Sequence, residues 1–289
     1  MLLGFSSFNA EAFSILTRKE GSNVQLLRIT SYSDYFPFGA AIGNSRDFLA
    51  LDSLFSDVFE QYILPKDYRL EFVAFENLEE TLSALHDNKA EVFVGAYYAS
   101  NDFEKLDFVF PAVLVNPVHL MMTPDKISMV KKLDDLKNLK GIYNSKEHFA
   151  DYTIQKLKEM NVEPVESADE AYKKILTGEA DYLLGSYYYN YAKTAEMGLK
   201  DYVSFSTGAL WNMPMFIAIS KGAKNAKNVH ELFRRLASDD VFRESVVENL
   251  KKTVKEREEA SQGVVPPMYV RAGGENDLTP ADEVMKGEE

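Results

Sequence analysis

The sequence predicts an α/β protein with two similar lobes, each a mostly parallel sheet flanked by helices, joined by two crossing segments. One motif occurs twice, as Lys89-Ala-Glu-Val-Phe-Val-Gly-Ala-Tyr-Tyr98 and as Glu179-Ala-Asp-Tyr-Leu-Leu-Gly-Ser-Tyr-Tyr188. Two copies indicate a duplicated unit and not a solenoid array. Strand and helix patterns alternate around each copy, which favours right-handed crossovers and parallel sheets. Apolar residues 108–115 and 211–219 would cross between the lobes, in the geometry of hinge-bending closure around a ligand.

The first half shows the order strand, helix, strand, helix, strand. Runs rich in β-branched and aromatic residues predict the strands, and apolar residues three and four apart predict the helices. Pro65 would end the first helix, and Asn77 can cap the second, which has two glutamates in its first turn. The predicted elements are residues 26–30, 48–63, 70–75, 78–86 and 91–94.

The second half repeats this order. Ser145 and Ser167 stand where each of its two helices would need an N-cap. After the second crossing, residues 228–257 carry Leu, Phe and Val at helical spacing. The predicted elements between the crossings are strand 139–143, helix 146–160, strand 162–165, helix 168–176 and strand 181–184.

These patterns divide the chain into lobe one, residues 24–111 and 213–257, and lobe two, residues 112–212. Residues 1–23 form an N-terminal extension. Its Ala10-Glu11-Ala12 has the form of a signal-peptide cleavage site, but a basic region is missing and the apolar segment is short. A signal-peptide remnant and a loose extension both stay open. Residues 258–289, rich in Pro, Gly and acids, predict a disordered tail.

Composition excludes several function classes. The chain of 289 residues has a net charge of −13, and such a surface repels nucleic acid and anionic membranes. It has no cysteine, which excludes disulfides and thiolate metal sites. Phosphate-binding loops and nucleophile elbows are absent, and the four histidines lack metal-ligand spacing. We therefore expect a monomer without cofactor, metal or catalytic residue.

Six motifs follow one another along the chain. They are Tyr35-Phe-Pro-Phe38, Ala90-Glu-Val-Phe-Val-Gly95, Leu106-Asp-Phe-Val-Phe-Pro111, Leu133-Asp-Asp-Leu136, Gly178-Glu-Ala-Asp181 and Phe216-Ile-Ala-Ile-Ser-Lys-Gly222. In these motifs and their order, the sequence resembles the amino-acid-type solute-binding proteins (family 3) of bacterial ABC transporters over residues 24–257. The resemblance implies a two-lobed periplasmic binding fold of type II, a periplasmic or extracellular location, a small-molecule ligand and a membrane ABC permease as partner.

Departures from the family pattern fall on ligand recognition. The arginine that clamps a ligand carboxylate in this family is replaced by Asp102, and the aspartate that takes the ammonium group is replaced by Ser186. The family's Gly-Thr-Thr loop corresponds to Lys146-Glu147-His148. The resemblance therefore implies capture of a small polar organic solute, amino-acid-like or an amine, without the usual clamp.

The candidate binding residues lie where the two strand ends and the neighbouring loops should meet. Aromatic rings can stack on a ligand, but they also serve as packing. Side chains alternate at a strand end, so one tyrosine of each pair should point inward. Asp102 would attract a cationic amine, while Ser145 and Ser186 would offer hydrogen bonds, unless Ser145 only caps a helix. The candidates are Tyr35, Phe38, Tyr97, Tyr98, Asp102, Ser145, Ser186 and Tyr187.

Three rival functions stay open beside solute delivery. One is a ligand-sensing module of a signalling system. Another is a lyase-like enzyme on the same scaffold, with His148 or Glu147 as the base. The last is a degenerate pair of lobes that binds a protein or peptide.

Overall fold

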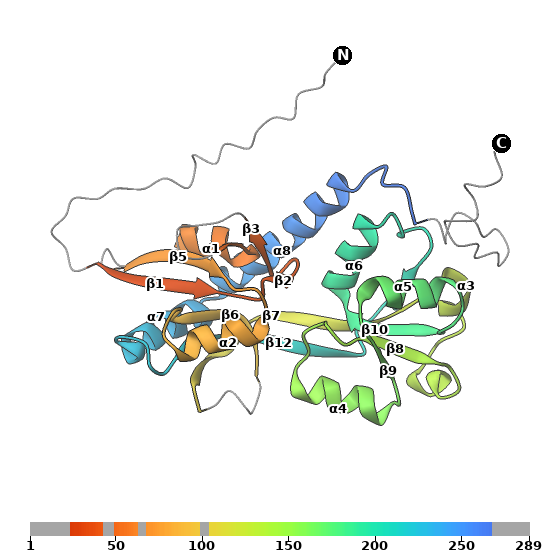
Figure 1. Cartoon of the computed structure of the whole chain (residues 1–289), viewed down its shortest axis with the longest axis horizontal. Coiled ribbons are helices and arrows are strands. Elements are labelled where there is room, and N and C mark those ends of the chain that lie inside the picture. Colours follow the sequence, from red (N-terminus) through yellow and green to blue (C-terminus); the bar gives the residue numbers. More distant parts are fainter. Residues whose placement is uncertain (1–23, 43–48, 63–67, 99–103, 268–289) are drawn as a thin grey trace, which may run out of the picture.

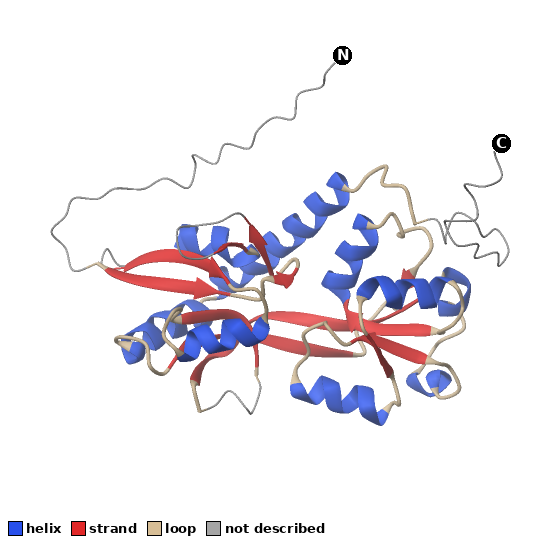
Figure 2. Ribbon diagram, in the orientation of Figure 1, coloured by secondary structure: helices blue, strands red, loops and turns tan. Residues whose placement is uncertain are grey.

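A computed structural model describes residues 24–42, 49–62, 68–98 and 104–267. The strands form one continuous arrangement that passes through both lobes, in the order β2-β3-β4-β5-β1-β6-β12-β7-β10-β8-β9, with β11 (Ser204–Phe205) beside β7. Helices cover the strands in each lobe (Figures 1 and 2). The predicted α/β fold with two lobes is confirmed.

Each lobe has a parallel core of three strands, in the predicted order. In lobe one, β1 (Gln25–Thr30) pairs in parallel with β5 (Tyr68–Ala74) and β6 (Val92–Tyr97). In lobe two, β8 (Gly141–Asn144) pairs in parallel with β10 (Tyr182–Ser186) and β9 (Glu163–Val165). The duplicated motif thus supplies β6 and β10, the strands that adjoin the crossing strands.

Two long antiparallel strands connect the lobes, as the apolar segments predicted. They are β7 (Leu106–Met122) and β12 (Trp211–Ser220), and they pair from Trp211 with Val118 to Ser220 with Leu106. Their register shifts between Met215 and Ile217. A shift of this kind bends a strand locally, and on β12 it lies where Met215 and Ile217 also pair with β6 of lobe one.

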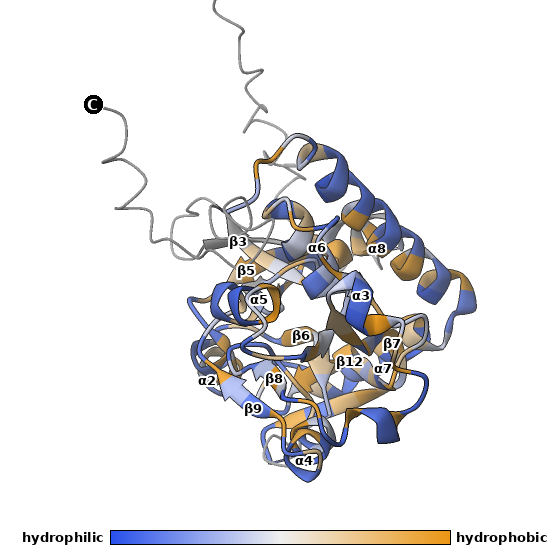
Figure 3. Ribbon diagram, turned by 90° about the vertical axis from the view of Figure 1, so that its right-hand side faces the viewer, coloured by the Kyte–Doolittle hydropathy of each residue, from blue (hydrophilic) through white to orange (hydrophobic). Residues whose placement is uncertain are grey.

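Three apolar clusters fill the molecule. The largest lies under the strands and helices of lobe one and extends to Ala150 and Tyr189 of lobe two, and two smaller clusters lie on the strands of lobe two. Apolar residues concentrate on the central strands, whereas the outer turns of α4 and α8 are largely hydrophilic (Figure 3). The helices are α1 (Leu54–Tyr62), α2 (Leu78–His86), α3 (Pro124–Ile127), α4 (Asp151–Glu159), α5 (Ala168–Leu176), α6 (Tyr187–Glu196), α7 (Ala226–Ser238) and α8 (Asp240–Ala260), with a 3₁₀ turn at Leu133–Leu136.

Two predicted helix caps are confirmed. The side chain of Asn77 accepts a hydrogen bond from the Glu80 N–H at 2.9 Å, and that of Ser167 accepts one from the Glu170 N–H at 3.1 Å. Each satisfies a backbone donor that the first helical turn leaves free.

The prediction of a helix from residue 48 is wrong in its first part. A short antiparallel meander of β2 (Asp34–Tyr35), β3 (Gly39–Ile42) and β4 (Leu49–Asp52) precedes the helix. The strand β4 pairs with the preceding strand β3 on one side and, through Leu49 and Ala50, with β5 on the other, so it is held in a sheet. The helix begins only after Ser53, whose hydroxyl accepts from the Phe55 N–H at 3.3 Å.

The prediction that Ser145 caps a helix is also wrong. The helix α4 begins at Asp151, and the hydroxyl of Ser145 donates instead to the Val165 carbonyl at 2.9 Å. Residues 145–150 form a turn and loop that continue from β8. This loop carries Glu147 into the contact between the lobes.

Candidate functional site

The carboxyl group of Glu147 lies at the centre of the contact between the lobes. Its Oε1 accepts from the Ser186 N–H at 2.5 Å and from the Tyr35 hydroxyl at 3.3 Å. Its Oε2 accepts from Nδ2 of Asn190 at 3.3 Å. Ser186 and Asn190 belong to lobe two and Tyr35 to lobe one, so this side chain is held mainly within its own lobe and is contacted from the other.

Asn116, in the middle of the crossing strand β7, joins the same network. Its Nδ2 donates to the hydroxyls of Tyr97 at 2.7 Å and of Tyr35 at 3.2 Å. Its Oδ1 accepts from the hydroxyl of Ser186 at 2.7 Å. One buried amide therefore links the strand ends of both copies of the duplicated motif.

Aromatic rings surround the polar network and also cross between the lobes. The rings of Tyr32 and His148 stack with centroids 4.4 Å apart and an interplanar angle of 20°. Tyr35 packs against Tyr189, with centroids 5.2 Å apart. Rings of this kind offer flat apolar faces with a polar tip, which suits a small solute with both apolar and polar parts.

Glu147 is a buried acid without a cationic partner among the described residues. Its side chain is contacted by Ser186, Asn190 and Tyr35, none of which carries a positive charge. Burial raises the pKa of Glu147 to about 8, against the opposing effect of these three hydrogen bonds. Burial likewise raises the pKa values of Tyr35 and Tyr97 well above 10.0, so both hydroxyls stay neutral.

The close approach of Glu147 to the strand β10 requires a glycine. A Cβ atom added at Gly185 would lie 2.4 Å from Nδ2 of Asn190 and 2.7 Å from Oε2 of Glu147. The Gly of the Gly-x-Tyr-Tyr motif thus makes room for the network in lobe two.

Three of the predicted binding residues come together here. Tyr35, Tyr97 and Ser186 are 1%, 5% and 0% exposed, and all three belong to the network around Glu147 and Asn116. Phe38 is fully buried beside Tyr35, and its ring reaches Tyr188 of lobe two at 6.5 Å between centroids. Whether these residues bind a ligand stays a prediction.

The other predicted binding residues lie apart from this network. Tyr98 is 47% exposed and packs on Phe110 and Phe108, which fits the alternation expected after Tyr97. Tyr187 packs on His119 and Phe205 within lobe two. Ser145 bonds to the strand β9, and Asp102 lies outside the described residues.

Several residues of the network escape the sequence prediction. Asn116 is a single amide within an apolar run, and that isolation is a signal that could have marked it. The sequence places Glu147 in the loop that corresponds to the family's Gly-Thr-Thr and offers it as a base in the enzyme alternative, but it does not predict its place in this network. Asn190 lies one helical turn beyond Ser186, and its Oδ1 accepts from the hydroxyl of Tyr172 at 2.9 Å. Nothing in the sequence pattern separates this asparagine from an ordinary helix residue.

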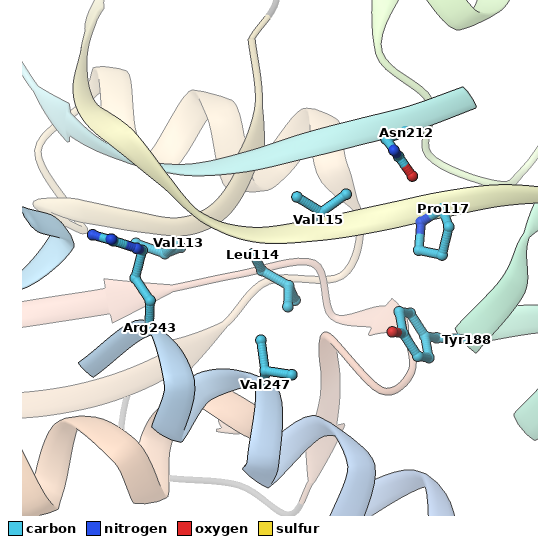
Figure 4. A pocket seen from close by; sticks show the side chains of 8 residues that line it. All are labelled: Val113, Leu114, Val115, Pro117, Tyr188, Asn212, Arg243 and Val247. Atoms are coloured by element: carbon cyan, nitrogen blue, oxygen red, sulfur yellow. The ribbon is translucent and has the colours of Figure 1, made fainter. Parts of the chain in front are cut away.

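A separate groove runs along the crossing strands. It has a volume of about 400 Å³ and lies between β7, β12, α8 and the start of α6 (Figure 4). Its walls are apolar except for Asn212, Arg243 and the hydroxyl of Tyr188. Arg243 pairs with Asp240 and donates to the Ala237 carbonyl, so its charge is already compensated. The residues that line it are Val113, Leu114, Val115, Pro117, Tyr188, Asn212, Arg243 and Val247.

Metal and membrane chemistry find no support in the described part of the chain. No cluster of three or more His, Asp or Glu side chains there could hold a metal ion. None of the described helices combines the length and apolar character needed to cross a bilayer.

No protein-family model matches the sequence, and no curated protein matches it. Solved structures do resemble the fold. The binding component of an ABC transporter from Wolinella succinogenes, complexed with lysine, is 17% identical with a TM-score of 0.61, over 78% of this chain and 94% of that chain. An amino acid ABC transporter substrate-binding protein from Streptococcus pneumoniae bound to L-arginine is 15% identical with a TM-score of 0.57, over 80% and 94%.

A third similar structure bears on the enzyme alternative. It is an ancestral amino-acid-binding protein described as a precursor of cyclohexadienyl dehydratase, 17% identical with a TM-score of 0.53, over 81% of this chain and 94% of that chain. At these identities the likeness concerns the fold. It confirms that the chain has the two-lobed architecture of amino-acid-type solute-binding proteins.

Proposed function

We propose that this protein captures a small polar organic solute, an amine or amino-acid-like, between its lobes and delivers it to a membrane ABC permease. The observation that carries the proposal is the network around Glu147, in which polar groups of both lobes and of a crossing strand converge on one buried point. In an α/β protein, ligands bind outside the carboxyl ends of the strands. The residues Tyr97 and Ser186 end such strands in each lobe.

Hinge motion would open this point to a solute. The lobes are joined by β7 and β12, whose pairing shifts register between Met215 and Ile217. Opening would separate Tyr35 from Glu147, while Ser186 and Asn190 would keep the carboxyl group oriented. A solute could then replace the contact between Tyr35 and Glu147, and closure would bury it. Delivery to a permease would place the protein in the periplasm or outside the cell.

A thermal-shift screen tests solute binding. The protein, stripped of co-purified ligand, is heated with amino acids, polyamines, betaines, short peptides and sugars. A ligand at about 100 times its Kd adds roughly 2.7 kcal/mol of stability, which raises the Tm of a protein this size by roughly 5–10 °C. We expect one solute class to give such a shift. No shift from any class would contradict the proposal.

An enzyme on the same scaffold is the second candidate. Glu147 has a pKa near neutrality and adjoins His148, and both are features of proton-transfer sites. The similar structure described as a dehydratase precursor gives this candidate its support. Recovery of the bound solute unchanged favours binding, and its conversion to a product favours the enzyme.

A further inference from the structure

Lobe two offers two N–H donors toward the contact with lobe one, and both are taken by Glu147. They are the backbone N–H of Ser186 and Nδ2 of Asn190, one on each oxygen of the carboxyl group. The second hydrogen of Asn190 Nδ2 goes to the Ser186 carbonyl at 2.9 Å. The chain therefore fills its own anion-binding donors with its own carboxyl group.

A ligand carboxylate would bind weakly beside Glu147. Its natural partners, two converging N–H groups, are occupied, and it would face Glu147 at close range. Ionised Glu147 would repel a ligand carboxylate at this desolvated site, and protonated Glu147 would offer it no counter-charge. Among the described residues, no lysine or arginine contacts Glu147 and could supply that counter-charge.

A positively charged group would bind favourably beside Glu147. An ammonium group would replace the Tyr35 hydroxyl on Oε1 of Glu147 and supply the missing counter-charge. The buried rings of Tyr35, Tyr97 and Tyr32 stand on the lobe-one side. A cation over the face of a tyrosine ring is attracted by its electron density, and more strongly when both are desolvated.

We infer that, if the proposed solute binding holds, the solute is an organic cation without a carboxylate group, and Glu147 is its counter-charge. The amines, polyamines and quaternary ammonium compounds are the chemical classes that meet this description. The inference narrows the proposed function and rests on it.

Binding of a cation should release a proton. Glu147 has a pKa of about 8, so its carboxyl group holds a proton at pH 6, and the cation needs the ionised form. Affinity should therefore rise roughly tenfold from pH 6 to pH 7 and level off above pH 8. The other titratable groups that interact with Glu147 are Tyr35, Tyr97 and Tyr172. Its chain neighbour His148 stacks on Tyr32, and Tyr189 packs on Tyr35.

Pairs of compounds that differ by one carboxylate test the inference. Calorimetric titration of the stripped full-length protein uses agmatine against arginine, cadaverine against lysine, and choline against betaine, at pH 6, 7 and 8. We expect at least one member without a carboxylate to bind at least tenfold more tightly than its partner, with an affinity that rises with pH. The variant Glu147→Gln should lose that preference, and Glu166→Gln, which removes an exposed acid of the same lobe, should keep it.

Two results separate the failure of this inference from the failure of the proposed function. If an amino acid or a neutral solute of the wider panel binds and no amine does, the inference is overturned and solute binding stands. If no compound of either panel binds, the proposed function falls, and the inference falls with it.

Discussion

Glu147 has an ionisable carboxyl group and is nearly completely buried, since it is 6% exposed. Taking an ionised carboxylate out of water without a cation is costly, and such a group takes up a proton instead. Three hydrogen bonds reduce this cost but do not remove it. Groups with strongly shifted pKa values and specific partners occur often at functional sites. The residue therefore has a chemical property that simple packing does not require.

The raised pKa of Glu147 predicts how stability depends on pH. Between about pH 4.5 and pH 8 the folded protein holds this proton and the unfolded chain does not. The contribution of Glu147 to the free energy of unfolding thus falls as pH rises through that window, by up to about 1.4 kcal/mol per pH unit. Urea denaturation of wild type and Glu147→Gln at pH 5, 6.5 and 8 measures it.

Glu147→Gln should remove this part of the slope and should unfold with a free energy roughly 3 kcal/mol higher than wild type near pH 7. The exposed Glu166→Gln serves as the control and should keep the wild-type slope. Identical slopes in wild type and Glu147→Gln would show that the carboxyl group is ionised in the folded protein.

The end of β10 and the start of α6 form the element that orients Glu147. Ser186 ends the strand and caps the helix, where its hydroxyl oxygen accepts from the Tyr189 N–H at 3.4 Å. Asn190 follows one turn later and returns a hydrogen bond to the Ser186 carbonyl at 2.9 Å. Strand end, helix cap and first turn thus act as one unit, with Gly185 giving the space beside it.

Gly185→Ala should disrupt this unit. The added methyl group would overlap Asn190 and Glu147, so we expect a loss of about 1–3 kcal/mol in the free energy of unfolding, typical of overpacking. Gly208→Ala is the matched control, because a Cβ there meets nothing within 4 Å and its φ is not positive. It should change the free energy of unfolding by less than about 0.5 kcal/mol. Equal effects of the two substitutions in chemical denaturation would contradict the packing described for Gly185.

Elements that are marked by nearby residues could be predicted from the sequence. The duplicated motif predicts the strands β6 and β10. Asn77 caps α2 and Ser167 caps α5, as expected. Residues 49–52 pair with β3 and β5 as the strand β4, and these sheet pairings override the helical spacing of their sequence. The loop 145–150 likewise departs from a helix because Ser145 bonds to Val165.

The candidate site was predictable in part for the same reason. Strand ends could be located, so Tyr35, Tyr97 and Ser186 were placed near one another. Asn116 and Asn190 reach the network through the pairing of β7 with β10 and β12, and through the start of α6. The meeting of these two asparagines depends on how the strands pair in the folded sheet. It cannot be predicted from the sequence pattern of each element alone.

At the scale of the whole molecule, aromatic packing and a few surface polar contacts join the lobes beside the buried network. The helices α6 and α8 lie side by side (Figure 1), with an ion pair between Arg257 and Glu196 at 3.0 Å. A hydrogen bond from Tyr191 to Glu258 at 2.9 Å accompanies it. Exposed ion pairs contribute little to stability. A solute bound to both lobes would favour the closed arrangement.

The most direct test of a site between the lobes is the affinity of the strongest solute from the screen for one variant on each lobe. Tyr35→Ala changes lobe one, Glu147→Gln changes lobe two, and Glu166→Gln is the exposed control. Calorimetric titration should show a loss of at least tenfold for both site variants and wild-type affinity for the control. Wild-type affinity in either folded site variant would contradict the account, because the solute would then not be held between these two residues.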